Sequence, residues 1–450
     1  MSVILIKILQ FVVSLSLLVM IHEFGHYIAA RIFKIRVEKF YIFFNPWFSL
    51  YKRKVGNTEY GIGWLPLGGY VSLAGMIDES MNLEQMKQEP QPWEFRTKPA
   101  WQRLIVMLAG VTMNVVLAIV IYSGMLYAWG DSYMLNDNMV NGYSFNEAGE
   151  KLGFKDGDRI LSIDGQHIGR VEEIGEMLLI ADATRSVELV RDGETMTLDI
   201  PLEKLVDMRE SGGYKGLYKE YAPFIVERVV SQSAIDAGLL AGDHITSIDG
   251  VAVDNFIDGM NQLQTIKERT VDIVVERSAT DSLNNQTTEI VTLPTYIGED
   301  SLIGIERKQF TLAEPTHIEY GFWESIPAGI KRAGSEISSY WEQLKMIVNP
   351  DTKLYKEVGG FIAIGSVFPD EWNWQSFWNI TALISIILAV MNLLPIPGLD
   401  GGHALFTLWE IITRRKPSDK FMEVMQWIGL AILFALLIYA NGNDILKLFN

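Results

Sequence analysis

The residues with the clearest chemical potential are two histidines and a glutamate near the N-terminus. His22, Glu23 and His26 form the pattern H-E-x-x-H within the stretch HEFGH. A spacing of four residues on a helix places both imidazoles on one face, about 6 Å apart along the axis. Two imidazoles so placed can bind one metal ion, and the adjacent carboxylate can deprotonate a water bound to it. The same five-residue pattern also arises by chance, and the histidines would then be ordinary surface residues.

The surroundings of this motif argue against a chance occurrence. The three residues lie inside an apolar run from Val3 to Ile32. A carboxylate inside a transmembrane helix costs at least about 2.5 to 3.5 kcal/mol, so the motif implies a polar cavity lined by protein. A proton relay or ion path in a transporter remains an alternative, because transporters also place histidine and glutamate within the membrane.

A second motif near the C-terminus can supply a further ligand. The stretch NLLPIPGLDG begins at Asn392, and two prolines break the helix before Asp400 and free backbone groups at membrane depth. The chain has no cysteine, so any metal must rest on histidine and carboxylate ligands. We therefore expect His22, His26 and Asp400 to hold a zinc ion with water in the fourth position, although such ligands also accept other divalent ions.

Four apolar runs must position these motifs. Each approaches the roughly 20 residues that a helix needs to cross the hydrocarbon core. The runs are Val3–Ile32, Leu104–Trp129, Phe377–Leu394 and Phe421–Ala440. A hydrophobic content of 49% and a mean hydropathy of +0.15 agree with a membrane protein. The first run is long for a signal peptide and lacks a convincing cleavage site, so we expect it to be retained.

Basic residues predict the orientation of these spans. Residues 31–54 contain seven lysines and arginines, and residues 414–420, between the last two spans, contain four more. By the positive-inside rule both loops are cytoplasmic. Both termini and residues 131–320 then lie on the opposite side, which for a bacterial inner membrane is the periplasm. The two motifs lie towards the cytoplasmic side.

The charge of the chain is unevenly distributed. Residues 131–320 contain 16 Lys and Arg against 35 Asp and Glu, whereas the whole chain has a formal charge of −17, so the remainder is slightly basic. Nucleic-acid binding requires a cationic face that displaces counterions from phosphates, and an acidic ectodomain lacks one. The pattern fits a membrane protein in contact with lipid and argues against nucleic-acid partners.

The acidic block contains an internal repeat. The sequence GDRILSIDG at Gly157–Gly165 recurs as GDHITSIDG at Gly242–Gly250, an offset of 85 residues. Each copy predicts a Gly-Asp turn, an alternating strand and an Asp-Gly turn, followed by a helix and further strands. The repeats resemble circularly permuted PDZ domains of bacterial proteases. The alternative is a generic small β domain with Asp-Gly hairpins.

The two motifs together resemble the site-2 protease family of intramembrane zinc metalloproteases, in particular its bacterial sigma-E-regulating branch. The resemblance covers nearly the whole chain, with HEFGH, NLLPIPGLDG and the inserted repeats in the family order. It implies that His22, His26 and Asp400 bind zinc, that Glu23 is the general base, and that Asn392 handles the substrate backbone. His403 is expected either to support the ligands from outside the metal site or to be structural, and Asn114 is a candidate lining residue of the catalytic cavity.

The resemblance also assigns the loop after the first span. The stretch Pro66-Leu67-Gly68-Gly69-Tyr70 resembles a membrane-embedded β hairpin that presents an edge strand, near residues 61–71, to substrate; a simple interfacial loop is the alternative. Gly68, Gly69 and Tyr70 are therefore predicted to contact substrate. One departure is Val358-Gly359-Gly360-Phe361, where family members tend to have a Gly-Pro pair.

The expected fold is a multi-pass α-helical membrane protein of four transmembrane helices and an embedded β hairpin, with two inserted periplasmic PDZ-like α+β domains. The expected substrates are single-pass membrane proteins: an anti-sigma factor already cut in the periplasm, and remnant signal peptides. A PDZ scaffold without catalysis and a transporter are the competing functions. The expected segments are 1–129 (first two spans), 130–220 and 221–312 (PDZ-like domains), 313–375 (amphipathic interfacial segment) and 376–450 (last two spans).

Overall fold

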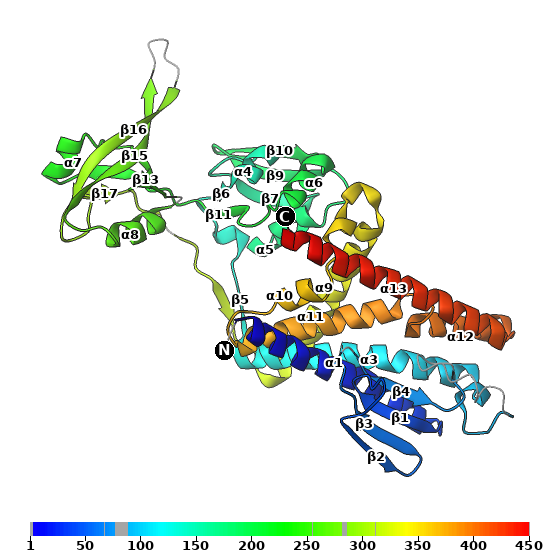
Figure 1. Cartoon of the computed structure of the whole chain (residues 1–450). Helices are drawn as coiled ribbons and strands as arrows, with labels where there is room; N and C mark the ends of the chain where they lie inside the picture. Colours follow the sequence, from blue (N-terminus) through cyan, green and yellow to red (C-terminus); the bar gives the residue numbers. More distant parts are fainter. Residues whose placement is uncertain are drawn as a thin grey trace. The chain divides into compact units, whose positions relative to one another are not determined.

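The computed structural model describes residues 3–66, 68–76, 89–253, 255–280, 286–310 and 312–449 (Figure 1). Leu67, part of the predicted substrate loop, lies outside these residues. The chain forms two compact units. The first unit combines Met1–Asp131 with His317–Asn450, and the second unit is Ser132–Thr316.

The first unit is mainly helical. Its helices are α1 (Val3–Ile32), α3 (Ala100–Trp129), α9 (Phe322–Val348), α10 (Phe361–Ser366), α11 (Trp374–Leu393), α12 (Asp400–Thr413) and α13 (Asp419–Phe449), with short 3-10 turns at Phe95–Thr97, Pro350–Thr352 and Leu354–Glu357. Among the described residues, four helices are long and apolar enough to cross a membrane: α1, α3, α11 and, in α13, Lys420–Lys447. The four predicted spans are thus confirmed, and the protein is a multi-pass membrane protein.

Local sequence signals set the ends of these helices. Helix α3 begins after Pro99 and ends at Gly130, whose φ of 69° is one that L residues with side chains rarely adopt. Helix α11 begins after Asn373, whose side chain caps it by accepting a hydrogen bond from the backbone amide of Ser376. It ends at Leu393, two residues before Pro395, which cannot continue the helical hydrogen bonding.

Helix α3 lies at the centre of the first unit and packs against α1, α11, α9 and α12. One apolar core joins α1, the first strands and the N-terminal half of α3, and it includes Ala404 of α12. Another joins the C-terminal half of α3 to α9 and α11, through residues such as Ala333 and Ile386. The segment predicted to be interfacial therefore contributes a long helix, α9, that packs on two spans.

The loop after the first span contributes strands to a larger sheet, and a hairpin at the predicted residues 66–70 is not confirmed. The described residues form a four-stranded mixed sheet in the order β2-β3-β1-β4, with β1 (Val37–Ile42), β2 (Tyr51–Val55), β3 (Thr58–Ile62) and β4 (Tyr70–Leu73) (Figure 1). Strand β1 lies between β3 and β4, so these two strands do not pair with each other. Gly61 lies on the inner strand β3, opposite both Tyr41 and Lys52. Strands β2 and β4 form the two edges of this sheet, and β4 pairs with β1 alone among the described strands.

Helix α12 was not predicted as an element. It starts at Asp400, the acidic residue of the second motif, and packs against α3. A largely buried ion pair joins the two helices, because Arg103 Nη2 lies 2.5 Å from Glu410 Oε1. The Gly-Gly departure has a local explanation: the buried carboxylate of Asp444 accepts hydrogen bonds from the backbone amides of Gly360, Ile362 and Ala363 at the start of α10.

The second unit contains two α+β cores. Its helices are α4 (Glu147–Leu152), α5 (Val171–Leu179), α6 (Leu202–Glu210), α7 (Gln232–Ala237) and α8 (Phe256–Gln264). Its strands, with the two that carry the chain between units, are β5 (Asp131–Tyr133), β6 (Tyr143–Phe145), β7 (Arg159–Ile163), β8 (Gln166–His167), β9 (Arg185–Arg191), β10 (Glu194–Ile200), β11 (Tyr218–Glu220), β12 (Val226–Val229), β13 (His244–Ile248), β14 (Val251–Ala252), β15 (Arg269–Thr280), β16 (Gln286–Ile297), β17 (Ile305–Arg307) and β18 (Thr316–Ile318).

The two copies of the sequence motif adopt the same local structure. The sheet β10-β9-β7-β8 has the same strand pairing as β16-β15-β13-β14, and each has a register shift at the matching position of its first strand. Separate apolar cores lie within residues 139–217 and 224–303.

The copies also share a buried ion pair. Arg191 binds the buried carboxylate of Asp158 through two nitrogens at 2.8 and 2.7 Å, and Arg277 binds Asp243 in the same way at 2.7 and 2.8 Å. Both aspartates are essentially inaccessible to solvent. In each pair the carboxylate hydrogen bond raises the pKa of the arginine further above its ordinary value.

Candidate metal centre

Two glycines allow α1 and α3 to approach closely at the level of the histidines. A Cβ atom on Gly25 of α1 would lie 2.4 Å from the carbonyl oxygen of Ala109 in α3. A Cβ atom on Gly110 of α3 would lie 2.4 Å from Nε2 of His26 and 2.8 Å from Nε2 of His22. Small residues at helix contacts permit such approach in membrane proteins. Only glycine at position 110 leaves space for both imidazoles.

The chain break after α11 brings Asp400 to the same place. Residues 394–399 leave the helical path, and α12 starts with Asp400 in its first turn. Two glycines follow, and a Cβ on Gly401 would lie 2.2 Å from the carbonyl oxygen of Leu394. The sequence Pro-Ile-Pro-Gly-Leu-Asp-Gly-Gly therefore forms a tight reversal that points a carboxylate at the two histidines.

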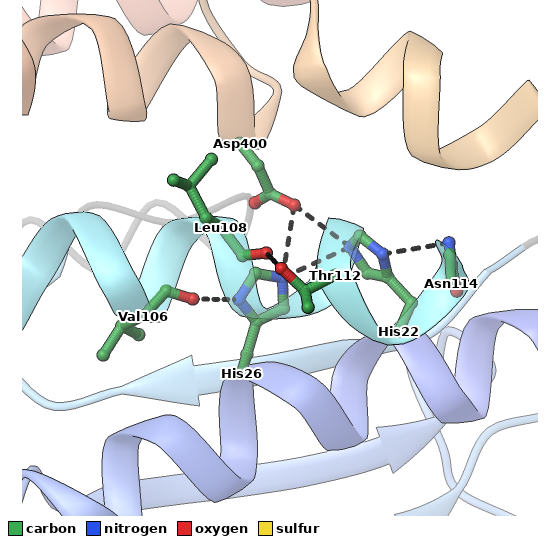
Figure 2. Close-up of polar contacts among 7 residues, drawn as sticks. All are labelled: His22, His26, Val106, Leu108, Thr112, Asn114 and Asp400. Carbon is green, nitrogen blue, oxygen red and sulfur yellow. Dashed lines mark hydrogen bonds and ion pairs between the residues drawn. The ribbon is translucent and has the colours of Figure 1, made fainter. Parts of the chain in front are cut away.

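Figure 2 shows the three side chains converging. Asp400 Oδ2 lies 3.1 Å from His22 Nε2 and 3.2 Å from His26 Nε2, and the two Nε2 atoms are 3.2 Å apart. Among the described residues, these three form the group of His and acidic side chains that could hold a metal ion. All three side chains are largely buried. The predicted ligand set is therefore assembled from α1 and α12, which are far apart in the sequence.

The dimensions of this triangle fit zinc. Three ligands at about 2.0 to 2.1 Å from a tetrahedral zinc lie about 3.3 Å from one another. The observed separations of 3.1 to 3.2 Å are close to this value. Moreover, Asp400 Oδ2 is buried and has no hydrogen-bond donor in the described structure. A buried carboxylate oxygen needs a cation or a donor, and zinc would satisfy it.

The protonation of His26 follows from its other contact. Its Nδ1 atom lies 2.8 Å from the carbonyl oxygen of Val106 in α3 (Figure 2). A carbonyl can only accept, so Nδ1 carries the proton and donates it. The lone pair of the neutral ring is then on Nε2, which faces the other two ligands. This backbone contact is the kind of outer interaction that orients a metal-binding histidine.

Asn114 of α3 plays the corresponding role for His22. Its side-chain amide lies 3.3 Å from His22 Nδ1, and it is fully buried. A metal on Nε2 leaves the proton on Nδ1, which then needs an acceptor. Asn114 Oδ1 is buried without a partner. A half-turn of the side-chain amide exchanges its oxygen and nitrogen. In that orientation Asn114 Oδ1 accepts a hydrogen bond from Nδ1–H of His22, so both atoms gain a partner.

Glu23 lies beside the triangle, between the ligands and the sheet. Its carboxylate interacts electrostatically with both histidines and with Asp400, and it accepts a hydrogen bond from the backbone amide of Val71. Val71 belongs to the edge strand β4. The candidate base is therefore held where the sheet edge meets the ligand set.

These groups line one cavity of about 260 Å³. The cavity is also lined by the predicted substrate residues Asn392, Gly68, Gly69 and Tyr70. Gly69 is again a necessary glycine, because a Cβ there would lie 2.6 Å from the carbonyl oxygen of Tyr41. Tyr70 stacks on Tyr41 at a centroid distance of 5.3 Å and donates a hydrogen bond to Asn45.

Sequence reasoning missed some contributors to the site. Gly110 gave no signal, because its importance depends on which helix face meets α1. Gln426 of α13, which the sequence did not single out, lines the cavity and is buried. His403 also lines the cavity, one helical turn after Asp400. The expected role of Asn114 as a lining residue agrees with its place in the cavity wall.

Comparisons with known proteins agree with this geometry. The family model described as Peptidase family M50 matches residues 10–436. A protein of Vibrio cholerae named "Putative zinc metalloprotease" is 30% identical over 471 residues and covers 100% of both chains. A protein of Haemophilus influenzae named "Regulator of sigma E protease" is 28% identical over 460 residues, with 98% of each chain covered.

A relative from Thermotoga maritima, named like the Vibrio protein, is 24% identical over 513 residues and covers 97% of this chain. The similarity thus extends over both units and both motifs, and not only over the histidine pair. Together with the four spans, the match identifies the chain as a member of peptidase family M50, the site-2 protease family, and as a zinc-dependent metalloendopeptidase.

Proposed function

We propose that this protein hydrolyses peptide bonds within the transmembrane segments of single-pass membrane proteins. His22, His26 and Asp400 are the proposed zinc ligands, and Glu23 is the proposed general base. The observation that carries the proposal is the triangle of ligand atoms, 3.1 to 3.2 Å apart, in a cavity between helices long enough to span a membrane. Hydrolysis at this position acts on a peptide segment that enters the cavity from within the bilayer.

Zinc held by these residues would lower the pKa of a bound water to about 7 and polarise the scissile carbonyl. Glu23 accepts the proton of the attacking water and passes it to the leaving amine. The contacts with Val106 and Asn114 hold the two imidazoles in the tautomer that presents Nε2 to the metal. The residues around the cavity thus fix the geometry before the substrate arrives.

A helical substrate hides its peptide bonds in its own hydrogen-bond ladder, so it must unwind before hydrolysis. Strand β4 offers a place for the freed groups, because it is an edge strand and lines the cavity. Addition of an extended substrate segment to this edge would align its backbone beside Glu23. Asn392, Gly68, Gly69 and Tyr70 are the proposed contacts of that segment.

The substrates proposed are an anti-sigma factor, after a first periplasmic cut, and remnant signal peptides. The name of the Haemophilus relative refers to regulation of sigma E and supports a role in an envelope-stress response. We place the protein in a bacterial inner membrane, with both termini and two PDZ-like repeats in the periplasm. The repeats act as a size gate for trimmed substrates; capture of a substrate's C-terminal carboxylate is the rival account.

Two matched substrates test this proposal. Both contain the same single transmembrane segment, and only one carries a folded periplasmic domain. The purified protein is incubated with each in lipid vesicles, and the products are mapped by mass spectrometry. We expect cleavage inside the transmembrane segment of the trimmed substrate and at least tenfold slower cleavage of the other, a difference of about 1.4 kcal/mol in the barrier.

Equal cleavage of both substrates would overturn the size gate while leaving the protease in place. Cleavage only outside the transmembrane segment would contradict intramembrane proteolysis. Inhibition of trimmed-substrate cleavage by a short peptide with a free C-terminal carboxylate, but not by its amide, would favour capture by the PDZ-like repeats over size exclusion.

A further inference from the structure

A second hollow, of about 490 Å³, lies at the C-terminal end of α1. Its lining comes from the end of α1, the start of β1, the β2–β3 turn and the segment before α3. The lining residues are Arg31, Lys34, Ile35, Arg36, Val37, Asn57 and Trp93. Three of these are cations, and among the described lining residues there is no carboxylate. We call this the cationic pocket.

The cations of this pocket lack charged partners in the described structure. No ion pair joins Arg31, Lys34 or Arg36 to a carboxylate among the described residues. Arg36 is half-buried, and its Nε–H group is buried with no acceptor. A buried donor that loses its water without gaining an acceptor is unfavourable, most of all on a charged group. An anion in the pocket would supply the acceptor.

The backbone around Arg36 is held from both sides. Helix α1 ends in a reversal, in which Lys34 has a φ of 57° and the amide of Ile35 donates to the carbonyl oxygen of Ala30. The amide of Arg36 then donates to the carbonyl oxygen of Trp93 at 3.0 Å, and its own carbonyl accepts from Ala74 at 2.9 Å. The backbone position from which the Arg36 side chain extends is therefore set by the fold before any ligand binds.

The position of the pocket indicates the anion. It lies at the end of a membrane-spanning helix, on the side that the basic loops predict to be cytoplasmic, where phospholipid head groups are found. Guanidinium groups pair with phosphate oxygens through two hydrogen bonds, and an ammonium adds a point charge. Basic pockets at the cytoplasmic ends of spans suit anionic head groups.

We propose that the cationic pocket binds a phosphate-bearing anion, with the head group of an anionic phospholipid as its source. Arg36 is the central contact, Arg31 and Lys34 complete the charge, and the indole of Trp93 forms one wall. The site is separate from the metal centre. Because it lies about five residues beyond His26 on α1, an occupied pocket anchors the end of the helix that carries both histidines.

Native mass spectrometry of the detergent-purified protein tests the proposal. The protein is exposed to equal amounts of phosphatidylglycerol and phosphatidylcholine, and retained lipids are counted. The pocket variant is Arg36→Gln with Lys34→Gln. The control is Lys52→Gln with Arg53→Gln, which removes the same charge from the exposed strand β2. Zinc content is measured in every protein to show that the variants are folded.

We expect the wild type and the control to retain one phosphatidylglycerol with about tenfold preference, and the pocket variant to lose that preference, as expected for loss of charge-assisted hydrogen bonds. Displacement of the lipid by millimolar inorganic phosphate would show that the head group alone is recognised; resistance to it would show that the acyl chains contribute. Equal retention by the pocket variant and the control, or no preference in the wild type, would overturn the proposal.

Discussion

Gly110 offers a sharp test of the metal centre, because it has no side chain and contributes only the room that the two imidazoles occupy. In Gly110→Ala, the new Cβ would lie 2.4 Å from His26 Nε2 and 2.7 and 2.8 Å from Cε1 and Nε2 of His22. Ordinary contacts between such atoms are about 3.5 Å or longer, so α3 or the rings must move by about 1 Å. Metal sites tolerate about 0.2 Å. We expect zinc affinity and cleavage to fall about 100-fold, as for other 1 Å misplacements.

The matched control is Gly124→Ala in the same helix. A Cβ at Gly124 would meet nothing within 4 Å, and both changes raise the intrinsic helix propensity equally. Zinc affinity is measured by competition with a chelator, and thermal unfolding is followed in the same samples. The control should match the wild type in both. Wild-type zinc affinity in Gly110→Ala would refute the packing argument and the placement of both histidines.

Two further predictions concern positioning and stability. Asn114→Leu should weaken zinc binding about 10- to 100-fold, because it removes the acceptor for His22 Nδ1. Asn114→Asp keeps an acceptor and should retain most of the zinc affinity. An equal loss of affinity in both variants would contradict this role. Arg191→Met should destabilise the first repeat by about 3 kcal/mol, because Asp158 stays buried without its cation. Limited proteolysis would report this loss. As the control, Arg228→Met breaks an exposed pair with Glu306 and should leave the stability nearly unchanged, because solvent screens that pair.

The three residues of the candidate metal centre could be selected from the sequence because their signals are local. His22 and His26 share a helix face by spacing alone, and Asp400 follows two prolines that mark a break in a span. Each signal requires only knowledge of helix geometry and of the cost of polar groups in lipid. The four spans were predictable for the same reason, since about 20 apolar residues define a span without any tertiary contact.

Residues whose roles depend on tertiary contacts were harder to predict. Gly110 is one of several glycines in the chain, and only the packing of α3 on α1 shows that it makes space for the imidazoles. The four-stranded sheet was not predicted, because β1 inserts between β3 and β4 and strand order is not encoded in alternation along a single strand. Gln426 belongs to no motif in the sequence, and only the fold places it in the cavity wall.

The central claim is that this chain cleaves membrane-embedded peptide bonds with a zinc ion and Glu23. Its most direct test compares the wild type with Glu23→Gln, measuring bound zinc and cleavage of a trimmed single-pass substrate with and without a chelator. We predict one zinc per chain in both proteins, with cleavage by the wild type alone and its loss after chelation. Undiminished cleavage by Glu23→Gln, or by a wild type stripped of metal, would contradict the account.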